Sequence, residues 1–125
     1  MQQTSEEKPN FCIQDECGRF WCIKLDAPRI ERVKQVLSID LLAAVASPEQ
    51  LGLSFSALLA DRVAMTAVIY YICETQIERI SVSPEEFGAS LGADAFLKAW
   101  ALICSQLAER SADPTVKHAL NSLFA

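Results

Sequence analysis

The longest apolar stretch of the chain is the uncharged run 63–73, between Arg62 and Glu74. As a helix, this run would be apolar on every side, and such a helix must be surrounded by protein. Asp61 is a suitable N-cap, so we predict a central helix from residue 61 to about Ile80. In a chain of 125 residues, this helix would form the middle of a small core.

Other segments combine helical apolar spacing with a helix start signal. Helices are predicted after Asp26, Asp40, Ser47 and Asp113, because each residue type caps helix N-termini and three are followed within two residues by proline. The first is expected to end near residue 37, and Gly52 is expected to interrupt the third.

The segment 83–110 carries the widest apolar surface. Ser83-Pro84-Glu85-Glu86 has the form of a capping box, Gly88 and Gly92 loosen the residues after it, and Asp94 is predicted to open a long helix to about residue 110. Two stripes run along this helix: Phe96, Ala99, Trp100, Ile103 and Leu107 on one side, and Leu97, Ala101, Cys104 and Ala108 on the other.

The residues before the helices favour strands. Two short β-prone runs flank Gly18, which can adopt the positive φ of a tight turn, so a hairpin is predicted over about 11–25. Residues 1–10 are polar and are predicted to form a disordered tail. The fold class is therefore mainly α: one domain over 11–125, with an N-terminal β-hairpin followed by several helices over about 27–124.

Composition narrows the class of protein. Hydrophobic residues make up 51% and charged residues 22%, with a net charge of −5. A negative chain repels phosphate backbones, so nucleic acid is an unlikely partner. No uncharged run reaches the roughly 18–20 residues of a membrane span, and the first ten residues do not resemble a secretory signal. The cytoplasm is the expected location.

Residues suited to catalysis or metal binding are few. The five cysteines show no C-x-x-C spacing, and His118, the single histidine, is far from them in sequence. Glu85 and Glu86 are explained by a first helical turn, where acids are favourable. We therefore predict no catalytic, metal-binding or cofactor-binding residues and no enzymatic activity.

Apolar surface in excess of one small core is the stronger signal. A helix with two stripes has a wide apolar face, which a partner chain can cover. Large aromatic residues left exposed would mark the contact surface; the candidates are Trp21, Tyr70, Tyr71 and Trp100. The predicted partner-binding residues are Leu97, Ala101, Cys104 and Ala108 of the second stripe, together with Tyr70 and Tyr71.

The order of motifs resembles a known group. The runs GRFWCIKL, RIERVKQVLSIDLL, AVIYYICE and SPEEFGASLGADAF, with Gly18, Trp21, Asp40, Phe87 and Gly92 as motif residues, are similar to tail assembly chaperones of tailed bacteriophages and prophage-like clusters. The resemblance covers roughly residues 17–108. It implies a small, mostly helical, non-enzymatic protein in the cytoplasm of a bacterial host.

Tail assembly chaperones coat the long hydrophobic tape measure protein before the tail tube polymerises, and some oligomerise. The resemblance therefore implies that this chain shields apolar helical segments of a tape measure or other tail protein. One alternative is a structural virion protein, such as a head–tail or baseplate component, with a permanent oligomeric interface. Another is a small DNA-binding regulator that uses the basic cluster Lys24, Arg29, Arg32 and Lys34.

Overall fold

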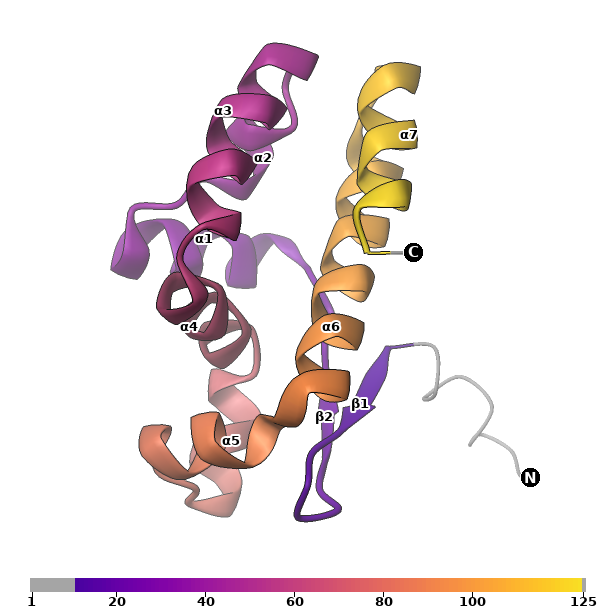
Figure 1. The fold of residues 1–125 in the computed structure, drawn as a ribbon. Helices are drawn as coiled ribbons and strands as arrows, with labels where there is room; N and C mark the ends of the chain where they lie inside the picture. Colours follow the sequence, from indigo (N-terminus) through magenta and orange to yellow (C-terminus); the bar gives the residue numbers. More distant parts are fainter. Residues whose placement is uncertain (1–10, 125) are drawn as a thin grey trace, which may run out of the picture.

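The computed structural model describes residues 11–124, so the predicted tail over 1–10 lies outside the described residues. The described residues form a short two-stranded sheet followed by helices, which confirms the mainly α fold class (Figure 1). Helix α6 (Pro84–Arg110) is the longest of these helices. Strand β1 (Cys12–Gln14) and helices α4 (Arg62–Ile72) and α7 (Pro114–Leu123) contact it. Helix α4 also contacts α1 (Ala27–Leu37), α3 (Pro48–Leu59) and α5 (Glu74–Ile80), so α4 and α6 together form the centre of the packing.

The predicted hairpin is present. Strands β1 (Cys12–Gln14) and β2 (Phe20–Cys22) are antiparallel, with Ile13 opposite Trp21. Gly18 has φ of +84° in the turn between them. Alternate side chains along the hairpin are buried, and Phe20 and Cys22 on the other face are exposed. The sheet therefore covers one side of the helices with a single apolar face.

The predicted start signals of the first helices are confirmed. Helices α1 (Ala27–Leu37), α2 (Leu41–Ala44) and α3 (Pro48–Leu59) begin after Asp26, Asp40 and Ser47, whose side chains accept hydrogen bonds from the backbone of the first turn. The expected interruption at Gly52 is wrong. Helix α3 runs through this glycine because the burial of Leu51, Phe55 and Leu58 outweighs a local penalty of about 1 kcal/mol.

The predicted central helix is divided in two. Helix α4 (Arg62–Ile72) is capped by Asp61 as expected, but it ends at Cys73, and α5 (Glu74–Ile80) follows. The Ile72 carbonyl accepts a hydrogen bond of 2.9 Å from the guanidinium of Arg29 on α1. The Cys73 thiol lies 3.8 Å from the carbonyl oxygen of Cys22, to which it donates. These contacts with distant segments accompany the break.

Helix α6 also contains a break. Gly92 has φ of +76° and ψ of 159°, so two helical halves meet there at an angle that Figure 1 shows clearly. The expected start at Asp94 therefore describes the second half, and the residues from Pro84 to Leu91 form a helix of their own. Helix α7 (Pro114–Leu123) follows its predicted cap, Asp113, and lies beside the second half of α6.

Side chains cover the outer edge of β2. The amide of Gln76 accepts a hydrogen bond from the Cys22 N–H and donates to the Phe20 carbonyl. Further along, Gln106 accepts from the Leu25 N–H and donates to the Ile23 carbonyl. An unpaired strand edge can pair with a strand of another chain. Because Gln76 and Gln106 already hydrogen-bond to backbone groups along this edge, we do not consider it a candidate partner site.

Among the described residues, α6 is long and apolar enough to cross a membrane. Helices α3 and α4 would qualify only as one span, and they are bent by 102°. Half of the apolar window of α6 is buried inside the chain, and Trp100 of this helix is fully buried. Core helices have these properties too, so we interpret α6 as the central helix of the core.

Candidate protein-binding groove

Helix α4 is apolar all round, but the chain covers only part of it. Its inner side is fully packed, with Met65, Val68, Ile69 and Ile72 buried. On the outer side Val63 is 80% exposed, which is the highest value among the exposed large hydrophobic side chains. The expectation that protein surrounds this helix is therefore wrong within residues 11–124. A polar face normally covers the solvent side of a helix, and here that side is apolar.

The uncovered side of α4 forms one wall of an open groove. The groove has a volume of about 420 Å³ and lies between α4 and the first turn of α6. Its lining residues are Arg62, Val63, Thr66, Ala67, Tyr70, Tyr71, Pro84 and Phe87. Their spacing on α4 follows one side of a helix, because positions i, i+3, i+4 and i+7 from Val63 are all present.

Aromatic rings make the far wall of the groove rigid. Tyr70 packs edge-to-face against Tyr71, with ring centroids 5.0 Å apart, and against Phe87 at 5.8 Å. Phe87 in turn contacts the fully buried Trp21 at 5.1 Å. The tyrosines are thus anchored to the core through Phe87. Rigid aromatic side chains that remain partly exposed are characteristic of interaction surfaces.

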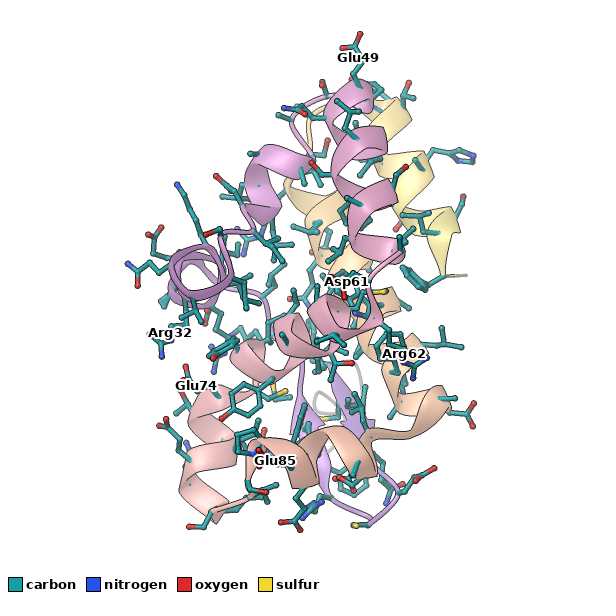
Figure 2. The ribbon with its side chains drawn as sticks, turned by 60° about the vertical axis from the view of Figure 1, so that its left-hand side comes forward. Arg32, Glu49, Asp61, Arg62, Glu74 and Glu85 are labelled. Atoms are coloured by element: carbon teal, nitrogen blue, oxygen red, sulfur yellow. The ribbon has the colours of Figure 1, made fainter. Side chains whose placement is uncertain are left out.

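Charges of opposite sign mark the two ends of the groove. Arg62 lies at the start of α4, where its guanidinium carbon is 4.1 Å from the centre of the Phe96 ring. Glu74 and Glu85 lie toward the other end of α4 (Figure 2). Burial raises the pKa of the Tyr70 hydroxyl, and the negative charges of Glu74, Glu78 and Glu85 raise it further. Tyr70 is therefore uncharged at neutral pH and faces an acidic border.

The structure only partly forms the predicted partner surface. Leu97 is 51% exposed and Ala101 is half-buried, but Cys104 and Ala108 are buried within this chain. We correct the prediction for these two residues, because the chain itself buries them on α6, around which β1, α4 and α7 pack. Tyr70 and Tyr71 line the groove instead, and none of the four residues of the stripe does.

The four aromatic residues proposed as contact candidates fall into two groups according to their burial. Trp21 and Trp100 are fully buried, whereas Tyr70 and Tyr71 are half-buried and line the groove. The two tyrosines were thus predicted as partner-binding residues from the sequence, but their neighbours in the groove were not. The available signal was the spacing of Val63, Ala67 and Tyr70 along a helix without charges, which we interpreted as evidence of complete burial.

Three of the four residues of the basic cluster on and before α1 have acidic partners, and the fourth, Lys24, is exposed. Arg32 forms an ion pair of 2.9 Å with Glu74, which Figure 2 shows side by side. Arg29 pairs with Asp26, and Lys34 lies 3.6 Å from Asp40. A phosphate backbone would have to compete with these carboxylates, so the geometry gives little support to a DNA-binding surface.

The buried cysteines are poor nucleophiles. Burial raises the pKa of the Cys73 and Cys104 thiols to about 12, so both are protonated at neutral pH. His118 is exposed on α7. Within the described part of the chain, no group of three or more His, Cys, Asp or Glu side chains could hold a metal ion.

Comparison with protein-family models, curated proteins and solved structures found no match for this chain. The groove is therefore interpreted from its own residues. These offer apolar and aromatic contact surface with charge at both ends, which suits the binding of a protein segment.

Proposed function

We propose that this chain is a non-enzymatic binding protein that shields an apolar helical segment of a phage tail protein, as a tail assembly chaperone shields the tape measure protein. The observation that supports the proposal is the open apolar groove along the outer side of α4. A soluble domain gains nothing by exposing such a strip unless another molecule covers it.

The groove fits an amphipathic helix. Such a helix presents apolar side chains at positions i, i+3, i+4 and i+7, which can pack against Val63, Ala67 and Tyr70 at the same spacing. Glu78 and Glu85, both exposed near one end, would pair with basic residues of the guest. The guest is therefore expected to carry lysine or arginine at that end of its apolar stripe.

Replacing Val63 with glutamate is expected to weaken guest binding by about tenfold to a hundredfold, because burying a valine side chain contributes roughly 1.5–3 kcal/mol. The fold should remain intact, since this side chain is exposed in the isolated chain. The measurement is the affinity for helical segments of the tape measure protein from the same gene cluster, by titration calorimetry.

The matched control is Leu53→Glu on α3. Leu53 is 72% exposed but does not line the groove, so its replacement should leave the affinity unchanged. Equal loss of binding in both variants, or no loss in Val63→Glu, would contradict the proposed site.

A structural virion protein remains the second candidate, because an apolar groove can also be covered permanently by another subunit. The presence of the chain in purified particles separates the two. A chaperone leaves before the tail matures, whereas a head–tail or baseplate component stays.

A further inference from the structure

Two cysteines face each other across the hairpin. Cys12 on β1 is the register partner of Cys22 on β2. The neighbouring pair Phe11–Ile23 is hydrogen-bonded, since the Ile23 N–H donates to the Phe11 carbonyl, and so is the pair Asp15–Arg19, an odd number of positions from Cys12–Cys22 in the same register. Cys12 and Cys22 therefore occupy a non-hydrogen-bonded position of the antiparallel ladder. At such positions the Cα atoms are about 4.5 Å apart and the side chains point to the same face.

This geometry is compatible with a covalent bridge. Disulfides join cysteines whose Cα atoms are roughly 4.4–6.8 Å apart, and the expected separation here lies at the short end of that range. Cys22 is exposed and Cys12 is partly exposed, so small oxidants can reach both thiols. The position follows from the strand register, and it lies outside the groove along α4.

We propose that Cys12 and Cys22 are a redox-modification site, at which a small disulfide oxidant such as oxidised glutathione converts the two thiols into a reversible cross-strand disulfide. The thiolate of one cysteine attacks the oxidant and forms a mixed disulfide, and one glutathione thiolate leaves. The second cysteine, as its thiolate, then attacks the protein sulfur of the mixed disulfide, and the second glutathione leaves. Two protein thiols are thus oxidised and one glutathione disulfide is reduced to two thiols.

The other cysteines do not compete for this bridge. Cys17 lies in the turn between the strands, where the register places no cysteine opposite it. The Cys73 thiol is close to the Cys22 carbonyl, but burial keeps it protonated at neutral pH, as it does for Cys104. An exposed bridge at the short end of the geometric range is readily reduced, so reduced glutathione should reopen it.

The test uses the full native chain and oxidised glutathione. After incubation, remaining thiols are blocked in acid and the protein is cut with trypsin and a glutamate-specific protease. These enzymes cut after Glu7, Glu16, Arg19 and Lys24, so Cys12, Cys17 and Cys22 fall on separate peptides covering residues 8–16, 17–19 and 20–24. Mass spectrometry then identifies which peptides are linked.

The expected result is a link between peptides 8–16 and 20–24 in most molecules, lost after treatment with reduced glutathione and retained in Cys17→Ser. In Cys12→Ser, Cys22 should carry glutathione instead. The proposal is overturned if the wild-type chain shows stable glutathione adducts on both cysteines, or if the bridge involves Cys17 or a second copy of the chain.

Discussion

Replacing Asp15 with alanine is expected to lower the free energy of unfolding by about 3 kcal/mol, because the change leaves the buried indole N–H of Trp21 and several part-buried donors without an acceptor. Asp15 is a buried carboxylate in the hairpin turn. One of its oxygens accepts from the backbone N–H groups of Cys17 and Arg19. The other accepts from the indole N–H of the fully buried Trp21 and from the Arg19 guanidinium, each at 2.9 Å.

The same carboxylate ties the hairpin to α6. Arg19, held by Asp15, donates to Ser90 and forms an ion pair of 3.0 Å with Glu86. The Glu16 N–H donates to the Ser90 carbonyl at 2.7 Å. Because Arg19 is partly exposed, water can replace some of its lost contacts. The expected loss therefore lies at the low end of the values for broken buried pairs.

The pH dependence gives a second readout of Asp15. Burial alone would raise the pKa of this carboxyl, but the hydrogen bonds from Trp21, Arg19 and Cys17 outweigh it and lower the pKa from 3.8 to about 2. The contribution of the charged form is complete above the unfolded pKa of 3.8 and is lost as the pH falls toward 2. The gap in stability between wild type and Asp15→Ala should therefore shrink over about pH 5 to 2.

Urea unfolding followed by circular dichroism measures both effects. Glu109→Ala is the control, because this acid is exposed at the end of α6 and its loss should change stability by no more than about 0.5 kcal/mol. If Asp15→Ala lowers the free energy of unfolding by no more than Glu109→Ala does, the stabilising role of the buried carboxylate is contradicted.

Replacing Gly92 with alanine is expected to destabilise the fold by about 2–3 kcal/mol. With φ of +76° and ψ of 159°, Gly92 occupies a backbone region that is essentially restricted to glycine. A Cβ atom there would lie 2.9 Å from Cγ and Oε2 of Glu16. The substitution therefore strains the junction of the two halves of α6 and displaces the exposed side chain of Glu16.

Gly52→Ala is a matched control of opposite sign. Gly52 is inside α3, and a Cβ atom there would meet nothing within 4 Å. Alanine should stabilise the helix by about 0.5–1 kcal/mol. Midpoints of thermal unfolding that fall for Gly92→Ala and rise for Gly52→Ala would agree with this account; equal shifts in the two variants would contradict it.

The sequence was sufficient to predict most helix starts. Asp26, Asp40, Ser47, Asp61 and Asp113 all cap the helices expected of them, because capping depends on a side chain and the backbone three residues away. The hairpin was predictable for the same reason. Its strand pattern and its glycine turn are both local signals.

Features that depend on distant residues could not be predicted. The break at Cys73 occurs where Arg29, 43 residues earlier in the chain, donates to the Ile72 carbonyl. The burial of Cys104 and Ala108 depends on how β1, α4 and α7 surround α6. Periodicity identifies an apolar side of a helix, but only tertiary packing decides whether the chain itself covers that side, as the exposure of Val63 demonstrates.

The most direct test of the proposed binding role is site-specific photo-crosslinking in the complex with a tape measure segment. A photoreactive amino acid replaces Val63 in the groove in one sample, and Leu53 on α3 in another. We expect the probe at position 63 to link covalently to the guest segment and the probe at position 53 to give no such product. Crosslinks from position 53 alone, or from position 63 only to a second copy of this chain, would contradict the proposed function.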